Sequence, residues 1–129
     1  MDHQTIMVVD DQTGIRLLLK EILKREGYAI LLAENGSRAL ELLSRRPALV
    51  LLDVRLPGIR GTDLLRQIGR QCPETKVVMM TAYGDRDLIA ETKAGGAVGY
   101  LEKPFDIPKL IAIVHREAPV GPLKNSNAD

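Results

Sequence analysis

Leu49-Val50-Leu51-Leu52-Asp53 is the most informative segment of this chain, because four apolar residues in succession run directly into a carboxylate. A run without polar alternation is typical of a strand that is buried on both faces, in the middle of a parallel sheet covered by helices. Pro57 and Gly58 then force a turn. We therefore expect a central strand over residues 49–53 that holds Asp53 at its C-terminal end.

Three other apolar runs end in polar residues in the same way. The runs are residues 6–9, 77–80 and 98–101, and the polar residues that follow them are Asp10, Asp11, Thr81 and Lys103. In open sheets of parallel strands, the carboxyl ends of the strands lie along one edge, where ligands bind at the point at which the strand order reverses. We therefore expect three carboxylates, one hydroxyl and one ammonium group to meet at one edge of the sheet.

Strands alternate with helical segments along the whole chain. Strands are expected over 5–9, 29–33, 49–53, 76–80 and 98–101, helices over 13–26, 37–46, 62–71, 86–94 and after Asp106, and a loop over 54–60. This alternation predicts an α/β fold, in which right-handed crossovers place helices on both faces of a five-stranded parallel sheet. We adopt the strand order 2-1-3-4-5 of the flavodoxin-like class, in which strands one and three flank the reversal.

The helix over residues 13–26 has an apolar stripe that should face the sheet. The stripe consists of Ile15, Leu18, Leu19, Ile22 and Leu23, at the spacing of one helix face. Leu17 points to the opposite side of the helix, so we expect it to be exposed. A single exposed leucine is common on protein surfaces, and a contact with a partner protein is the alternative explanation.

The composition limits the chain to a few classes of protein. Its 129 residues contain no second hydrophobic block, so we expect one domain over residues 1–118 and a flexible C-terminal tail over residues 119–129. The net charge is +1 with acidic and basic residues interspersed, which argues against bulk electrostatic binding to nucleic acid or to an anionic membrane. No apolar run approaches the roughly 18 residues of a membrane span, and the one cysteine cannot form an internal disulfide. We therefore expect a cytoplasmic protein.

The predicted acidic edge requires a cation. Three carboxylates within a few ångströms of one another cannot all stay ionised unless a cation is present or their pKa values rise. Lys103 supplies one positive charge. The remaining charge calls for a divalent metal ion, and oxygen ligands favour Mg²⁺, or alternatively Mn²⁺, over zinc. Because Mg²⁺ often completes its shell with phosphate oxygens, the site is predicted to take a phosphoryl group.

The position of each side chain at this edge suggests a role in phosphoryl chemistry. Asp53, alone at the tip of the central strand, can act as the nucleophile and form an aspartyl phosphate. Asp10 and Asp11 would hold the metal ion. Thr81 would donate a hydrogen bond to one phosphoryl oxygen, and Lys103 would pair with another. Each residue alone has an ordinary structural explanation, but their common place at the ends of successive strands favours the functional one.

These residues also carry a family resemblance that covers residues 5–117. The motifs are Asp10-Asp11, Asp53 followed by Leu56-Pro57-Gly58, Thr81-Ala82 and Lys103-Pro104-Phe105. Together they resemble the receiver domain of bacterial two-component response regulators. The resemblance implies Mg²⁺-dependent transfer of a phosphoryl group from a histidine to Asp53, with the backbone carbonyl of Arg55 as a further metal ligand. It also implies a cis peptide bond before Pro104 and a switch made of Thr81 and Tyr100.

Within that family, several stretches look like the single-domain phosphorelay regulators of sporulation initiation. The stretches are Val8–Gln12, Gly14–Arg16, Glu26–Tyr28, Met80–Gly84 and Lys103–Ile107. This likeness implies a monomer that is a phosphoacceptor and no conventional enzyme, and that receives phosphate from a sensor histidine kinase and relays it to a histidine phosphotransferase. By the same likeness, the docking surface would consist of Gln12, Gly14, Ile15, Leu18, Pro104, Phe105 and Ile107, with Leu17 beside it. Tyr100 stands where those regulators carry a histidine.

Arg55 and Tyr83 bear on the lifetime of the phosphoryl group. They lie two residues beyond Asp53 and Thr81, at positions that in this family flank the path of the attacking water. Long side chains there are expected to obstruct in-line hydrolysis, so the resemblance predicts a phosphoryl group that persists for minutes or longer.

Four other functions are alternatives to the phosphorelay. A stand-alone receiver of the chemotaxis type, which binds an effector when phosphorylated, would differ in its partner and not in its chemistry. A phosphatase with an aspartyl nucleophile would need a second acid at the position of Arg55. A flavin carrier would need a loop rich in Ser, Thr and Gly where the chain has Asp10 and Asp11. A transcription factor would need a DNA-binding domain, which we do not expect in residues 118–129.

Overall fold

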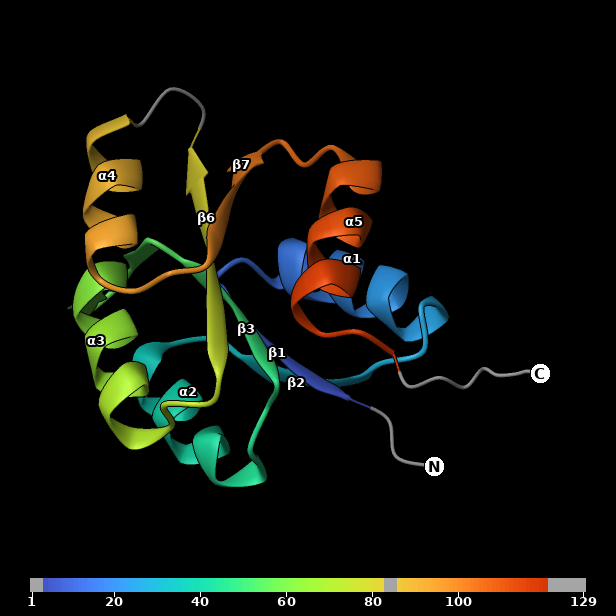
Figure 1. Ribbon diagram of the computed structural model, residues 1–129, viewed down its shortest axis with the longest axis horizontal. Helices are drawn as coiled ribbons and strands as arrows, with labels where there is room; N and C mark the ends of the chain where they lie inside the picture. The colour runs from blue at the N-terminus through green and yellow to red at the C-terminus, as the bar shows by residue number, and fades with distance from the viewer. Residues whose placement is uncertain (1–3, 83–85, 121–129) are drawn as a thin grey trace.

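The computed structural model of this protein describes residues 4–82 and 86–120 (Figure 1). Its main sheet has five parallel strands in the order β2-β1-β3-β6-β7, which confirms the predicted fold class and strand order. The strands are β1 (Thr5–Val9), β2 (Ala29–Ala33), β3 (Leu49–Asp53), β6 (Lys76–Ala82) and β7 (Gly99–Lys103).

Helices cover both faces of the sheet. α1 (Thr13–Arg25) and α5 (Ile107–Glu117) pack on one face, and α2 (Gly36–Leu42), α3 (Gly61–Gln71) and α4 (Arg86–Ala94) lie on the other (Figure 1). Two polar residues begin helices as side-chain caps, because Asn35 accepts from the Arg38 amide and Asp106 accepts from the Lys109 amide. The core is therefore divided into two apolar layers, one on each side of the sheet.

The central strand β3 is buried along its whole length, as the unbroken apolar run predicts. Leu49 and Leu51 belong to the layer beneath α1 and α5, whereas Val50 and Leu52 belong to the layer beneath α2 and α3. All four side chains are fully inaccessible to solvent. Alternate side chains of a strand point to opposite faces, so a strand with helices on both sides needs an apolar residue at every position.

Residues 54–60, which were predicted to be a loop, form a small antiparallel hairpin. β4 (Arg55–Leu56) pairs with β5 (Ile59–Arg60). Pro57 and Gly58 make its turn, and the positive φ of 85° at Gly58 is suited to glycine. Leu56 and Ile59, on either side of the turn, pack against the layer beneath α2 and α3, which holds the hairpin down.

Several element ends also differ from the sequence prediction. The strands β6 and β7 run on to Ala82 and Lys103, because the two strands continue to pair with each other beyond the apolar runs. The helix expected over 37–46 ends at Leu42 and continues as a 3-10 turn, Leu43–Arg45. Arg46 then takes a left-handed conformation with φ 54°, so the helix stops before Pro47.

Leu18 was predicted to face the sheet, and this prediction was wrong. Its side chain is 46% exposed, and Leu17 beside it is 54% exposed, as expected. The buried part of α1 is centred between Ile15, Leu19 and Leu23. At 100° per residue, Leu18 lies about a quarter turn from that centre, so it falls on the flank of the helix and not beneath it.

The C-terminal end of the described chain stays against the domain. Ala118 is buried, the carbonyl oxygen of Pro119 accepts a hydrogen bond from the Gln4 side chain at 3.0 Å, and Val120 packs against the core. Residues 121–129, the rest of the expected tail, lie outside the described residues. No described helix combines the length and the apolar character that crossing a membrane requires.

Candidate functional site

The predicted acidic cluster forms where β1 and β3 end side by side. Val9 pairs with Leu52 in the sheet, so the residues that follow, Asp10 and Asp53, are neighbours at the carboxyl edge. Carboxylate oxygens of Asp10, Asp11 and Asp53 all lie within 4.8 Å of one another. Asp10 and Asp53 are buried, whereas Asp11 is exposed. The cluster is thus open to solvent on the side of Asp11.

Lys103 joins the two buried carboxylates from the end of β7. Its Nζ lies 2.9 Å from Asp10 Oδ2 and 3.2 Å from Asp53 Oδ2. The other oxygen of each carboxylate accepts from a backbone amide two residues on: Asp10 Oδ1 from Gln12 at 2.9 Å and Asp53 Oδ1 from Arg55 at 3.0 Å. Both carboxylates are therefore held in fixed orientations.

The electrostatics of the cluster are unbalanced. Burial raises the pKa of Asp53, and the charge of Asp10 adds to this effect, although the Arg55 amide and the Lys103 ammonium oppose it. Burial alone would lower the pKa of Lys103, but its hydrogen bond to Asp10 and the negative charges of Asp53 and Asp10 raise it overall. Lys103 thus stays a cation, and one cation does not fully compensate the buried acids.

The ligand set fits a divalent cation of the Mg²⁺ type. The three side chains that converge offer only carboxylate oxygens, and such an ion would neutralise the negative charge that Lys103 leaves uncompensated. The resemblance also makes the backbone carbonyl of Arg55 a metal ligand. Arg55 lies next to the cluster, because its backbone amide donates a hydrogen bond to Asp53 Oδ1.

Thr81 adds a buried hydroxyl to the same edge. It lies one residue beyond Met80, which pairs with Asp53, and its side chain is fully buried. Within the described residues, Thr81 Oγ1 has no hydrogen-bond partner. A buried hydroxyl without a partner is unfavourable, so it is suited to bond an oxygen that arrives with a ligand.

Two supporting residues at this edge were not found from the sequence. Gly61 packs so closely on the residues after β3 that a Cβ atom there would lie 2.5 Å from Val54 Cα and 2.8 Å from the Asp53 carbonyl oxygen. Arg16 reaches back from α1 and donates from a guanidinium nitrogen to the Asp10 carbonyl oxygen at 2.7 Å. The glycine was visible in the sequence only as a residue near a turn, and the Arg16 contact had no sequence signal.

The residues of the expected docking surface lie on α1 and on the segment between β7 and α5. The exposed residues are Gln12, Gly14, Leu17, Leu18 and Pro104, and the half-buried ones are Ile15, Phe105 and Ile107. Ile15 and Phe105 pack against the same apolar layer, which joins the two segments. A Cβ atom at Gly14 would meet nothing within 4 Å, so the fold itself does not require a glycine there.

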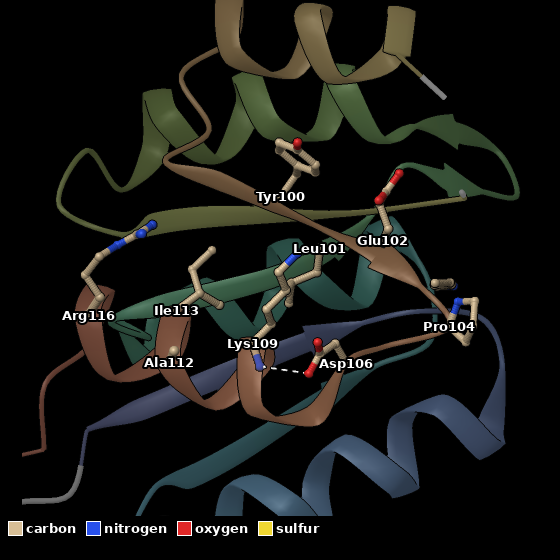
Figure 2. Close-up of a pocket in the computed structure, with 10 residues that line it drawn as sticks. Tyr100, Leu101, Glu102, Pro104, Asp106, Lys109, Ala112, Ile113 and Arg116 are labelled. Carbon is tan, nitrogen blue, oxygen red and sulfur yellow. Dashed lines mark hydrogen bonds between the residues drawn. The ribbon is translucent and has the colours of Figure 1, made fainter. Parts of the chain in front are cut away.

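Tyr100, the expected switch residue, lies on β7 with 38% of its surface exposed. It borders a cavity of about 650 Å³ between β7 and α5, which Ile113 and Lys109 also line. Figure 2 shows the Tyr100 ring on the opposite side of β7 from these α5 side chains. The peptide bond between Lys103 and Pro104 is cis, as the resemblance implies. Tyr83, which was expected to shield the phosphoryl group, lies outside the described residues.

Comparisons with known proteins agree with this geometry. The model of the response regulator receiver domain matches residues 6–115. The sporulation initiation phosphotransferase F of Bacillus subtilis is 41% identical over 121 residues, which are 93% of this chain and 98% of that protein. The DNA-binding transcriptional regulator NtrC of Escherichia coli is 40% identical over 117 residues, which are 90% of this chain but 25% of that protein. The solved structure of the chemotaxis protein CheY4 of Vibrio cholerae matches with a TM-score of 0.84 at 28% identity and covers 90% of this chain and 99% of its own.

Proposed function

Since the chain belongs to the response regulator receiver domain family, we propose that Asp53 accepts a phosphoryl group from a sensor histidine kinase and passes it to a histidine phosphotransferase, in a sporulation-type phosphorelay. A receiver domain is a phosphoacceptor signalling module and implies a histidine kinase as partner. The observation that carries the proposal is the meeting of Asp10, Asp11 and Asp53 beside Lys103. The likeness to the Bacillus subtilis phosphotransferase over nearly its whole length supports the relay. We place the relay in the cytoplasm, as the sequence composition predicts.

The first transfer uses Asp53 as the nucleophile. One of its carboxylate oxygens forms a bond to the phosphorus of a phosphohistidine, the phosphorus–nitrogen bond breaks, and the imidazole leaves with the bonding electron pair and takes up a proton. In the second transfer, a neutral histidine of the phosphotransferase attacks the same phosphorus, and Asp53 leaves as a carboxylate. The chain thus carries the group between two histidines and undergoes no net change.

The surrounding side chains hold the reacting group. Mg²⁺, when bound by Asp10, Asp11, Asp53 and the Arg55 carbonyl, would neutralise negative charge on the transferring phosphoryl group. Lys103, which contacts Asp53 at 3.2 Å, is close enough to pair with one phosphoryl oxygen after transfer. The unpartnered hydroxyl of Thr81 would donate to another.

The surface of α1 supports docking of helical partners at this site. Leu17 and Leu18 are two large apolar side chains that remain about half exposed next to each other, whereas Leu19 and Leu23 on the same helix are fully buried. Gly14, one turn earlier, leaves room for a close approach of a partner's backbone. We expect these residues, with Gln12 and the half-buried Ile15, to contact the histidine-bearing helices.

A second candidate is a stand-alone receiver that binds an effector through β7. The exposed Tyr100 on β7 favours it, because an aromatic residue at that position can change its exposure when Thr81 moves. The chemistry at Asp53 is the same in both candidates. They differ in whether the phosphoryl group leaves to a second histidine or stays while an effector binds.

Intact mass after incubation with acetyl phosphate tests the shared chemistry. We expect a phosphoryl adduct that requires Mg²⁺ and that disappears in Asp53→Asn. Asp63→Asn is the matched control, because Asp63 is an exposed acid on α3 whose partner is Arg66. Absence of the adduct on folded protein, or its persistence in Asp53→Asn, would contradict the assignment of the phosphoacceptor.

A transfer assay then separates the two candidates. The phosphorylated chain is mixed with a purified histidine phosphotransferase, and the label on each protein is followed. We expect transfer, and we expect Leu17→Ala with Leu18→Ala to slow it while leaving phosphorylation by acetyl phosphate unchanged. Phosphate that stays on the chain in the presence of several phosphotransferases would favour the stand-alone receiver.

The lifetime of the phosphoryl adduct tests whether the Arg55 side chain slows its hydrolysis. This side chain is exposed at the start of β4, two residues from Asp53. We propose that it obstructs the approach of water, so the adduct should persist for minutes or longer in Mg²⁺, and Arg55→Ala should shorten that time. Release of phosphate within seconds from the unaltered chain would contradict the proposal.

A further inference from the structure

A second group of titratable side chains lies at the opposite end of the sheet from Asp53. Glu26 follows α1, Tyr28 immediately precedes β2, and His115 lies in the last turn of α5. Tyr28 is buried and packs its ring against that of His115, with 5.7 Å between the ring centroids. The proposed phosphoryl chemistry uses none of these three side chains.

The three side chains form one continuous chain of hydrogen bonds. Tyr28 Oη lies 2.6 Å from the carbonyl oxygen of Ala118 and 3.1 Å from His115 Nδ1. His115 Nε2 lies 2.7 Å from Glu26 Oε1. This series of hydrogen bonds thus links Glu26, at the end of α1, to His115 on α5 and then, through Tyr28, to Ala118 at the end of α5.

Counting protons along this chain gives the state of His115. A carbonyl oxygen can only accept, so the one hydroxyl proton of Tyr28 is used on Ala118. Burial, with a smaller contribution from the charge of Glu26, raises the pKa of Tyr28 to about 12, so this proton is present at neutral pH. His115 Nδ1 must then donate to the Tyr28 oxygen. The carboxylate of Glu26 can also only accept, so Nε2 must donate as well.

Both ring nitrogens donate at once only in the imidazolium form. In the neutral form that keeps its proton on Nε2, the Nδ1 lone pair competes with Ala118 for the single Tyr28 proton. In the other neutral form, the Nε2 lone pair faces the carboxylate oxygen of Glu26. Either neutral tautomer loses one of the three hydrogen bonds.

Other charged groups lie near this end, among them Lys24 and Arg25 in the last turn of α1, where Arg25 pairs with Glu21 at 3.4 Å. On α5 itself, Arg116 and Glu117 bond each other at 2.7 Å. Glu117 also lies 3.5 Å from Nζ of Lys76, at the start of β6. Among the described residues, the titratable groups in contact with the His115 ring are therefore Glu26 and Tyr28.

The hydrogen bond from Tyr28 to Ala118 acts on the segment that leaves α5. The segment continues with Pro119, which accepts from Gln4, and with Val120, which packs near Gly27 in the turn between α1 and β2. We propose that Glu26, His115 and Tyr28 form a proton-dependent latch, which holds the end of α5 against this turn and loosens it when His115 loses its second ring proton. The latch thereby couples the position of the C-terminal segment to the protonation of His115.

The nitrogen-15 chemical shifts of the imidazole rings test the protonation state directly. At pH 7 we expect both ring nitrogens of His115 to carry a proton in the full chain, because the three hydrogen bonds of the network require it. The second histidine of the sequence, His3, provides an internal comparison. Glu26→Gln, which removes the negative charge but keeps an acceptor, should convert His115 largely to a neutral tautomer. Glu21→Gln is the matched control, because Glu21 pairs with Arg25 on the exposed side of α1.

Amide hydrogen exchange at Ala118 tests the effect on α5. The Ala118 amide donates to the Val114 carbonyl in the last turn of the helix. Corrected for intrinsic rates, its protection should fall by a few fold to about tenfold between pH 5.5 and pH 8, as expected for loss of one hydrogen bond. Tyr28→Phe, which keeps the ring but cannot hold Ala118, should abolish this difference. A neutral His115 at pH 7 in the unaltered chain, or a pH dependence of protection that survives in Tyr28→Phe, would overturn the latch.

Discussion

The two ends of the sheet hold their ionisable groups in opposite ways. At the carboxyl edge, three carboxylates share one ammonium group, and burial raises the pKa of Asp53. At the amino end, one carboxylate meets one imidazole ring, and both ring nitrogens and the Tyr28 hydroxyl find partners. The unbalanced end is therefore suited to bind a cation and a phosphoryl group, and the balanced end is suited to hold two helices in place.

The largest effect is expected from removing the cation at the unbalanced end. Lys103→Met eliminates the ammonium group that contacts both Asp10 and Asp53. Because a charged group that stabilises developing charge is worth about 10²–10³ in rate, phosphorylation by acetyl phosphate at saturating Mg²⁺ should slow by about that factor. Lys109→Met, on the neighbouring α5, is the control and should react at the normal rate. A Lys103→Met chain that is phosphorylated as fast as the control would show that Lys103 only balances charge in the free state.

The next effect comes from the backbone that supports Asp53. In Gly61→Ala, the new methyl group would lie 2.5 Å from Val54 Cα, against backbone that cannot turn aside. We expect a loss of about 1–3 kcal/mol in the free energy of unfolding, measured with denaturant. Gly69→Ala is the matched control, because Gly69 lies on the same helix, α3, and a Cβ atom there would meet nothing within 4 Å. That substitution should stabilise the protein by about 0.5–1 kcal/mol. Equal effects at the two glycines would mean that the Asp53 segment is not tightly packed.

The unbalanced end was largely predictable from the sequence, because its signals are local. An apolar run that stops at Asp10 or Asp53 specifies both the strand and the residue at its end, and parallel pairing then brings the ends together. The family resemblance rests on these same residues, so it added roles to positions that the pattern had already selected. The sequence pattern alone does not place β1 next to β3. That neighbour relation was taken from the strand order of the flavodoxin-like fold class, and the structure has it.

The balanced end and the supporting contacts were not predictable, because they depend on distant packing. Tyr28 and His115 are 87 positions apart in the sequence, and each alone looks like an ordinary core or surface residue. The close approach of Gly61 to Val54 arises from the β4–β5 hairpin, whose strands are too short to show periodicity. Leu18 was misplaced for a related reason: helical spacing defines a stripe, but the sheet beneath α1 decides how wide the buried part is.

A pH experiment can distinguish the two ends through Asp53. Because the pKa of Asp53 is raised in the folded state, the folded chain binds more protons than the unfolded chain between the two pKa values, so stability falls as pH rises through this range. Asp53→Asn removes the unfavourable free energy of ionising a buried carboxyl group. The variant should therefore be more stable than the unaltered chain at pH 7 in a chelator. The difference should vanish as the pH falls below the ordinary value of an aspartate, and Mg²⁺ should reduce it at pH 7. Asp63→Asn should show neither trend in thermal unfolding.

The smallest effect is expected at the balanced end, at high pH. The pKa of Tyr28 is about 12 in the folded state, and the ordinary value for a tyrosine is about 10. Between these values the folded chain retains a proton that the unfolded chain has lost, so the stability due to Tyr28 is complete below pH 10 and declines as the pH approaches 12. Tyr28→Phe has no such proton, and its stability relative to the unaltered chain should rise by about 1 kcal/mol between pH 9 and pH 11. Denaturant unfolding at the two pH values measures this difference, and Tyr100→Phe, at an exposed tyrosine, is the control. If the two tyrosine variants behaved alike, the Tyr28 hydroxyl would be exchanging freely with solvent, and the amino end of the sheet would not be the closed network that its hydrogen bonds describe.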